Sequence, residues 1–265
     1  MRIALGVEYN GRGFCGWQAQ AGQRSVQSVL EAAVARVADH PVTLVCAGRT
    51  DAGVHASGQV VHFETTALRS PHNWRLGVSR HLPSDVAVPW ASAVSDAFDA
   101  RRSALARHYR YVLLNRAVRP GLCHGRVGWH WKPLDARRMH AAARCLLGEQ
   151  DFTSFRAAEC QAAHAWRRLD RVDVSRVGER LVIDVSGNAF LHHMVRNLVG
   201  SLCLVGAGAR DVGWIEAVLR ARDRRRAGPT AEAAGLYLAR VDYADGMLPA
   251  NVSDAASGGV MCGFE

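Results

Sequence analysis

The feature that most constrains this chain is an order of elements that occurs twice along it. In each half, short β-rich runs alternate with stretches whose apolar residues recur every three or four positions, the spacing of one helix face. Each half therefore predicts strand, helix, strand, strand, helix, strand. The repeat is limited to the order of the elements. No sequence identity between the two halves is visible.

The predicted elements of the first half begin almost at the first residue. Ser25 is a suitable N-cap for a helix whose apolar face starts at Val26, and Pro71 precedes a second helical pattern. The predicted strands cover residues 2–9, 42–46, 58–65 and 86–94.

The second half continues the same order and adds one helix. Two strands are expected to pair across Gly178. The predicted strands cover residues 106–115, 168–177, 180–186 and 236–243, and the predicted helices cover 135–147, 191–205 and 211–221.

This pattern predicts an α+β fold of two ferredoxin-like halves. We expect their sheets to be joined, their helices to lie on one face, and an active-site cleft to lie between them. The expected domains are residues 1–104 and 105–248. Residues 249–265 are small and polar, which predicts a flexible tail.

The composition of the 265-residue chain is that of a globular protein, with 49% hydrophobic and 22% charged residues. No apolar run approaches the roughly 20 residues that cross a bilayer, and the start of the chain lacks a signal-peptide core. Seven cysteines without a CxxC pair argue against a disulfide framework or a cysteine-rich zinc site. We therefore expect a soluble cytoplasmic protein without a membrane partner.

The formal net charge of +9 indicates a polyanionic partner, most often a nucleic acid. Four arginines, Arg101, Arg102, Arg107 and Arg110, lie close to two tyrosines, Tyr109 and Tyr111. Cations beside aromatic rings are typical of RNA binding. Alternation along a strand separates Arg107 from Arg110, so not all four can face one RNA.

The most unusual segment is AGRTDAGVHA at residues 47–56, which lies between two predicted strands. Glycines on both sides of Asp51 allow tight turns that would present its carboxylate sharply. By itself the pattern also fits a hairpin turn stabilised by an Asx hydrogen bond.

The segment GRTDAGVHA resembles the catalytic motif of the TruA class of tRNA pseudouridine synthases, and five further blocks resemble the family in the same order. The whole likeness covers about residues 2–245. The matching segments are FCGWQ at 14–18, FDAR at 98–101 before ARHYRY at 106–111, DFTSFR at 151–156, FLHHMVRN at 190–197 and GLYL at 235–238.

The resemblance implies an isomerase that converts uridine to pseudouridine at positions 38, 39 and 40 of the tRNA anticodon stem-loop. It also implies a homodimer that binds tRNA and needs no cofactor or metal. Asp51 matches the essential aspartate of the family, and Arg196 matches the arginine that pairs with it. Such a pair would lower the pKa of the carboxylate and hold it in place.

The resemblance gives three further residues a place around the target base. Arg49 would hold the RNA with the base flipped out of its stack. Tyr109 would stack on the uracil, and Leu236 would line its pocket. From alternation alone Tyr111 fits the stacking role equally well, and motif order favours Tyr109.

Two other classes of function fit parts of the sequence. A non-catalytic RNA-binding protein would have no need of a carboxylate in a basic loop, where it repels phosphate. A nucleic-acid hydrolase would be expected to carry a metal cluster or an acid/base pair, and the sequence indicates neither.

Overall fold

The computed structural model describes residues 1–249, which form two compact units. Among the described residues, unit 1 comprises 1–107 and 237–249, and unit 2 comprises 108–236. The expected division placed residues 236–243 in the second half. In the structure Tyr237 and Leu238 pair in parallel with His55 and Ala56 of unit 1. Which strand a given strand pairs with depends on residues far away in the sequence, so the residues of that strand alone do not predict its partner.

Unit 1 is a sheet with two helices. Strand β1 pairs antiparallel with both β3 and β4, and β2 pairs antiparallel with the later part of β3. The elements are β1 (Arg2–Tyr9), α1 (Val26–Ala38), β2 (Val45–Cys46), β3 (His55–Glu64), α2 (Pro71–His81), β4 (Val86–Val94) and β10 (Leu236–Tyr243).

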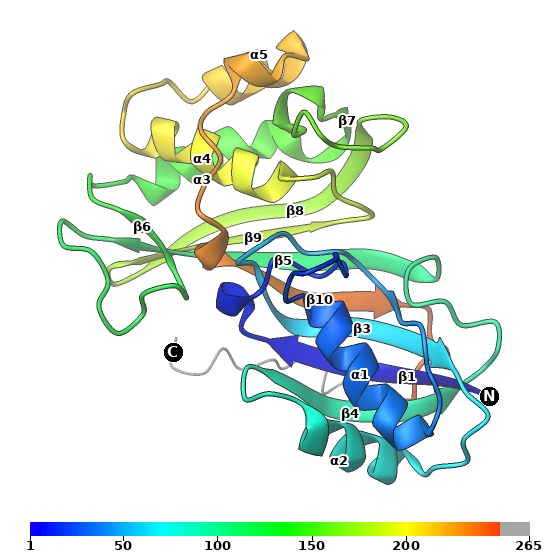
Figure 1. Ribbon diagram of the computed structural model, residues 1–265. Coiled ribbons are helices and arrows are strands. Elements are labelled where there is room, and N and C mark those ends of the chain that lie inside the picture. The colour runs from blue at the N-terminus through cyan, green and yellow to red at the C-terminus, as the bar shows by residue number, and fades with distance from the viewer. Residues whose placement is uncertain (250–265) are drawn as a thin grey trace. The chain divides into compact units, whose positions relative to one another are not determined.

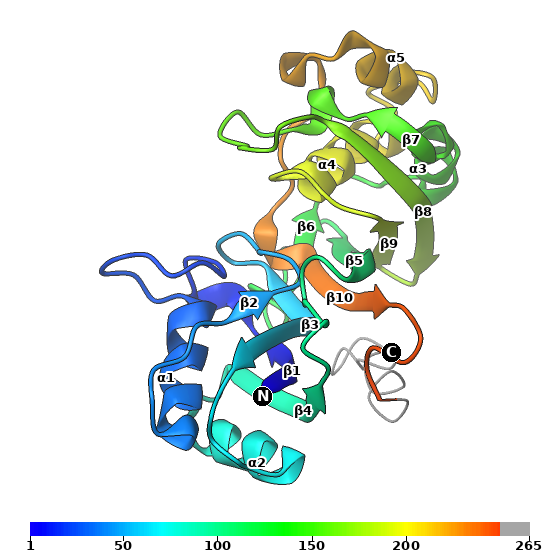
Figure 2. The ribbon, with the colours of Figure 1, turned by 90° about the vertical axis from the view of Figure 1, so that its right-hand side faces the viewer.

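The two helices of unit 1 begin where the sequence predicts. Ser25 caps α1 by accepting a hydrogen bond from the Ser28 N–H, and Ser28 returns a bond to the Ser25 backbone. Ser70 caps α2, with Pro71 in its first turn. Both helices lie on the same face of the unit-1 sheet (Figure 2).

Unit 2 also combines a sheet with helices and contains several short, irregular elements. Its strands follow the order β5-β9-β8-β7, and β6 pairs with β5. The elements are β5 (Ala104–Asn115, which starts in unit 1), β6 (Gly128–His130), α3 (Ala136–Ala143), β7 (Gly148–Asp151), β8 (Trp166–Val177), β9 (Arg180–Gly187), α4 (Met194–Gly206) and α5 (Trp214–Ala221).

Helices α3 and α4 pack together beside β8, with α5 beyond them (Figure 1). The hairpin of β8 and β9 turns at Gly178, whose φ is +58°, as predicted. Helix α4 begins at Met194, three residues later than predicted, because His193 adopts the left-handed conformation. The short strands β6 and β7 were not predicted, since three or four residues carry no readable alternation.

The expectation of a mixed α/β chain is confirmed: the described residues contain ten strands and five α-helices. The predicted tail falls outside these residues, except for residue 249. No helix within residues 1–249 is long and apolar enough to span a membrane.

Candidate active site

The AGRTDAGVHA segment connects β2 to β3, as expected, and its central residues lie against the FCGWQ segment. The Trp17 N–H donates to the Thr50 carbonyl at 2.9 Å, and Gly16 forms an isolated antiparallel bridge with Asp51. Two blocks that the sequence separates by about thirty residues thus form one structure. We call residues 48–54 the Asp51 loop.

Close approach between the two segments requires glycine at position 16. Its φ is +110°, and a Cβ there would lie 2.8 Å from the Thr50 oxygen. Any side chain would be strained and would displace the Asp51 loop. The glycine-tryptophan block therefore has a physical reason to accompany the aspartate motif.

Two buried side chains hold the Asp51 loop from inside. The Tyr9 and Thr50 hydroxyls lie 2.8 Å apart, and both residues are buried. The Gln59 amide donates to the Gly48 carbonyl at 2.6 Å and accepts from the Val60 N–H at 3.2 Å. Sequence analysis missed both; a glutamine among the apolar residues of a predicted strand was the available signal.

Asp51 itself is half-buried, whereas its neighbours Arg49 and Ala52 are exposed. The Asp51 carbonyl accepts from the Val54 N–H at 3.1 Å, which closes a turn around Gly53 at φ +76°. The loop thus fixes its backbone while its charged side chains lie at the surface of unit 1.

A second turn of unit 1 carries the exposed guanidinium groups of Arg101 and Arg102. The Asp99 carboxylate accepts from both their backbone N–H groups, at 2.9 and 2.8 Å. The Ala100 N–H donates to Nδ1 of buried His62 at 3.0 Å. We call residues 98–102 the basic turn.

Arg107 joins the two loops of unit 1. Its guanidinium donates to the carbonyls of Ala47 at 3.0 Å and of Arg101 at 2.6 Å, so it bridges the start of the Asp51 loop and the basic turn. Sequence analysis did not predict this bridge. The expected contact between Arg107 and an RNA phosphate stays a prediction.

Arg110 also has a partner within its own unit. Its guanidinium binds both oxygens of the Asp184 carboxylate at 2.7 and 3.1 Å, and this hydrogen bonding raises the pKa of Arg110. An arginine paired in this way has less charge available for phosphate.

The two tyrosines proposed for stacking have different environments in unit 2. The Tyr109 ring meets Phe190 edge to face, with centroids 4.9 Å apart. The Tyr111 hydroxyl donates to the Glu232 carbonyl at 2.9 Å, and burial raises its pKa. Tyr111 thus serves the core of unit 2.

The remaining predicted residues also belong to unit 2. Arg196 lies on the first turn of α4, where its Nε donates to the Ala231 carbonyl at 2.8 Å. Leu236 is buried at the start of β10. Asp51 belongs to unit 1 and Arg196 belongs to unit 2. Their pairing would connect the two units, and it stays a prediction.

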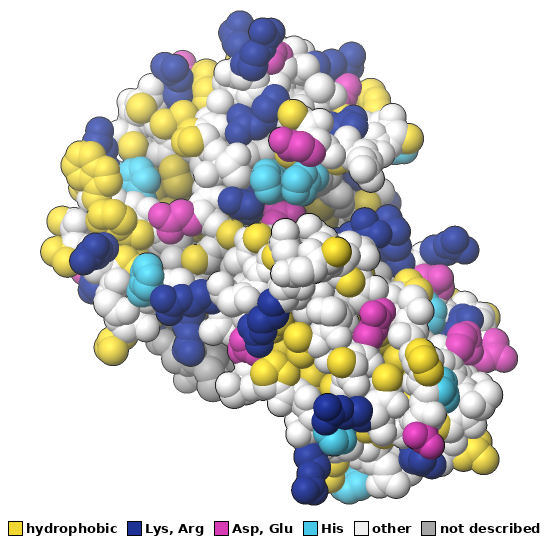
Figure 3. All heavy atoms as spheres, viewed as in Figure 1, with side chains coloured by type: hydrophobic (Ala, Val, Ile, Leu, Met, Phe, Trp, Pro, Cys, Tyr) yellow, Lys and Arg dark blue, Asp and Glu magenta, His cyan; other side chains and the backbone are white. Residues whose placement is uncertain are grey.

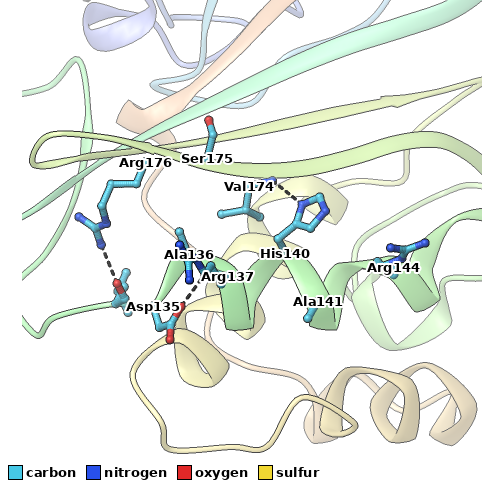
Figure 4. Close-up of a pocket in the computed structure, with 10 residues that line it drawn as sticks. Asp135, Ala136, Arg137, His140, Ala141, Arg144, Val174, Ser175 and Arg176 are labelled. Carbon is cyan, nitrogen blue, oxygen red and sulfur yellow. Dashed lines mark hydrogen bonds between the residues drawn. The ribbon is translucent and has the colours of Figure 1, made fainter.

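On the face shown in Figure 3, basic side chains are scattered instead of gathering in one patch. In unit 2, a groove between α3 and β8 collects Arg137, His140 and Arg144 on one side and Arg176 on the other (Figure 4). Arg176 is bound to the Leu134 carbonyl at 2.6 Å. Among residues 1–249, neither Arg137 nor Arg144 forms an ion pair. Charge alone therefore does not locate the RNA site.

Two buried thiols are unsuited to catalysis. Burial raises the pKa of Cys46 and of Cys203 to about 12, so both stay protonated at neutral pH. Cysteine nucleophiles and thiolate metal ligands are deprotonated, which these two groups are not.

Comparison with known proteins agrees with this geometry. A family model described as tRNA pseudouridine synthase matches residues 6–101 and 142–244, which include the Asp51 loop and α4. This chain belongs to the tRNA pseudouridine synthase family. The resemblance read from the sequence motifs is confirmed.

Proteins named tRNA pseudouridine synthase A share 55% identity with this chain in several bacteria. The match with the protein of Aeromonas salmonicida (strain A449) covers 92% of this chain and 90% of the relative. Those of Escherichia coli (strain K12 / DH10B) and Salmonella arizonae are equally similar over the same shares. A solved Cbf5-Nop10-Gar1 complex aligns over 89% of this chain and 58% of its own at 12% identity, with a TM-score of 0.37, a likeness too weak to bear on function.

Proposed function

We propose that this enzyme converts uridine to pseudouridine at positions 38, 39 and 40 of the tRNA anticodon stem-loop, with Asp51 as its catalytic carboxylate. The observation that carries the proposal is the family match, which spans the whole Asp51 loop. The 55% identity over nearly the full length supports the same reaction on the same class of RNA.

The reaction exchanges one glycosidic bond for another. The N1–C1′ bond of uridine breaks, the uracil rotates, and a C5–C1′ bond forms. C5 loses its proton and N1 gains one, so atoms balance without a cofactor or oxidant.

Asp51 would act as nucleophile or base on the flipped nucleotide. A carboxylate attacks carbon or removes a proton effectively only when it is ionised, positioned and partly stripped of water. A half-buried aspartate on a pinned loop suits this demand. Attack at C1′, attack at C6 and proton removal at C2′ are all compatible with it.

The other predicted residues would surround the target nucleotide. Arg196 would pair with Asp51, and Arg49 would hold the RNA with the base extruded. Tyr109, whose ring already packs against Phe190, would stack on the uracil beside Leu236. The arginines proposed to bind tRNA phosphates are Arg101, Arg102, Arg107 and Arg110.

The finer architecture belongs to this proposal too. Two ferredoxin-like halves, 1–104 and 105–248, would share a joined sheet with helices on one face and enclose the active site. The strand order β4-β1-β3-β2 of unit 1 supports the first half. We propose that the protein is a homodimer and acts in the cytoplasm. Light scattering of the purified protein would test the dimer, because it measures the mass of the particle in solution.

The decisive experiment measures tritium release from tRNA that carries C5-tritiated uridine. Formation of the C5–C1′ bond expels this tritium, so wild-type protein releases it and Asp51→Asn does not. Release by both proteins would remove Asp51 from the catalytic role. Release by neither, with tight tRNA binding, would favour an RNA-binding protein without catalysis.

Substitution of the tRNA tests the target positions separately. A transcript with cytidine at 38, 39 and 40 should release no tritium, whereas restoring a single uridine at one of them should restore release. Undiminished release from the triple-cytidine transcript would contradict the proposed positions.

A further inference from the structure

The Asp51 loop is held next to its aspartate by a hydroxyl pair that the reaction does not otherwise use. Thr50 is 6% exposed and Tyr9 is 4% exposed, and their hydroxyl oxygens lie 2.8 Å apart. Tyr9 is the last residue of β1, at the centre of the unit-1 sheet. The loop is thereby tied to a strand that pairs with a neighbour on each side.

Thr50 is fixed through its main chain as well as its side chain. Its carbonyl accepts from the Trp17 N–H at 2.9 Å on the side of the glycine-tryptophan block. Two attachments on one residue leave its peptide little freedom to rotate. Because Thr50 and Asp51 share a peptide bond, these two attachments also set the direction in which the Asp51 side chain leaves the loop.

The chemistry of the pair favours a single arrangement. Rotation of the loop away from Tyr9 would break a hydrogen bond between two buried hydroxyls, where water does not readily replace it, so such rotation is penalised. The Tyr9 ring packs near Trp17, with ring centroids 6.2 Å apart, and both side chains are buried. The hydroxyl pair therefore selects one loop position from those that backbone bonds alone would allow.

We propose that Tyr9 is a positioning residue, which acts through the Thr50 hydroxyl to hold the Asp51 carboxylate in its reactive place. The inference rests on the proposed catalytic role of Asp51. Tyr9 touches no reacting atom in this scheme. A displacement of about 1 Å in a catalytic group can cost about a hundredfold in rate.

The test compares Tyr9→Phe and Thr50→Val, which remove one hydroxyl each with little change of shape, and Thr50→Ser, which keeps the hydroxyl. We expect kcat for tritium release to fall about 10- to 100-fold in the first two, with KM for tRNA within about threefold. Thr50→Ser should stay within about threefold of wild type. The double variant Tyr9→Phe/Thr50→Val should be no slower than the slower single variant, because both remove the same bond.

Tyr243→Phe is the matched control. It removes a phenolic hydroxyl of the same unit, which donates to the Ala100 carbonyl at 2.7 Å and does not contact the Asp51 loop. Its loss of thermal stability should resemble that of Tyr9→Phe, while its kcat stays near wild type. A purely structural role of Tyr9 would make the two variants alike in kcat, and that result would overturn the proposal.

Asp51→Asn, assayed in parallel, distinguishes failure of the positioning role of Tyr9 from failure of the catalytic role of Asp51. If Asp51→Asn is inactive and Tyr9→Phe keeps wild-type kcat, the positioning role alone fails. If Asp51→Asn stays active, the proposed catalytic role of Asp51 fails first and the positioning role with it. Should Tyr9→Phe not fold, the pair Thr50→Val and Thr50→Ser decides, since equal kcat in these two would also refute the inference.

Discussion

The Asp51 loop and the basic turn of unit 1 are both fixed at the backbone, yet they present their charges differently. Asp51 has a short side chain that is half-buried, so the position of the loop decides the position of the carboxylate. Arg101 and Arg102 extend long, exposed side chains from a turn capped by Asp99. The difference fits the roles that we propose for them: bond exchange depends on atomic position, whereas phosphate binding depends on charge near the surface.

The largest expected effect separates turnover from binding. Asp51→Asn should lower kcat for tritium release to background while tRNA affinity stays within about tenfold, because arginine–phosphate contacts supply most of the binding. Filter binding and tritium release on the same preparation measure both quantities. Loss of binding and turnover together would contradict the division of roles between the two regions.

The next effect concerns the amide that holds the start of the Asp51 loop. Gln59→Met leaves the half-buried Gly48 carbonyl and the buried Val60 N–H without their partner, so the free energy of unfolding should fall by about 2–3 kcal/mol. Urea denaturation followed by circular dichroism measures the change. Gln150→Met, which removes a single 3.3 Å bond from a half-buried glutamine in unit 2, is the control and should cost clearly less.

A smaller effect should follow removal of charge from the basic turn. Arg101→Ala/Arg102→Ala should weaken tRNA binding several-fold at moderate salt and reduce the slope of log affinity against log salt by about 1–2. The double change should leave kcat at saturating tRNA nearly unchanged.

The groove of unit 2 supplies the matched control for that experiment. Arg137→Ala/Arg144→Ala also removes two positive charges, from helix α3 and the residue that follows it. The long-range electrostatic attraction between protein and tRNA should therefore weaken to a similar degree. The excess loss in the basic-turn variant measures direct phosphate contact. Equal or larger loss in the groove variant would move the RNA contact to α3.

The smallest expected effect is a pH dependence of stability at His62. Burial of this imidazole lowers its pKa, with Asp99 and Glu64 opposing the shift and Arg2 adding to it. The unfolded histidine, with a pKa near 6.5, takes up a proton that the folded one accepts only at lower pH. Stability from this residue is therefore complete above about pH 6.5 and is lost as pH falls toward the folded pKa.

Melting temperatures at pH 7.5, 6.5 and 5.5 would measure this loss, expected at about 2–4 °C from His62. His62→Asn keeps an acceptor for the Ala100 N–H but does not titrate, so its melting temperature should fall less on acidification. An identical decline in both proteins would show that other groups carry the pH dependence.

The sequence by itself determined the local elements and the reactive segment. The helix cap at Ser25, the helical pattern beside Pro71, the strand 86–94 and the hairpin at Gly178 follow from capping, alternation and turn geometry, which depend on neighbouring residues. The AGRTDAGVHA loop and the family resemblance needed nothing beyond residue order.

Only the tertiary structure decided what holds that segment in place. Tyr9 meets Thr50 across 41 positions, and Arg107 reaches Ala47 across 60. These partners are chosen when distant strands pair and bury polar groups that must then be satisfied. Local patterns predict which residues form a strand or a loop, but they do not encode which distant side chain will complete its hydrogen bonds.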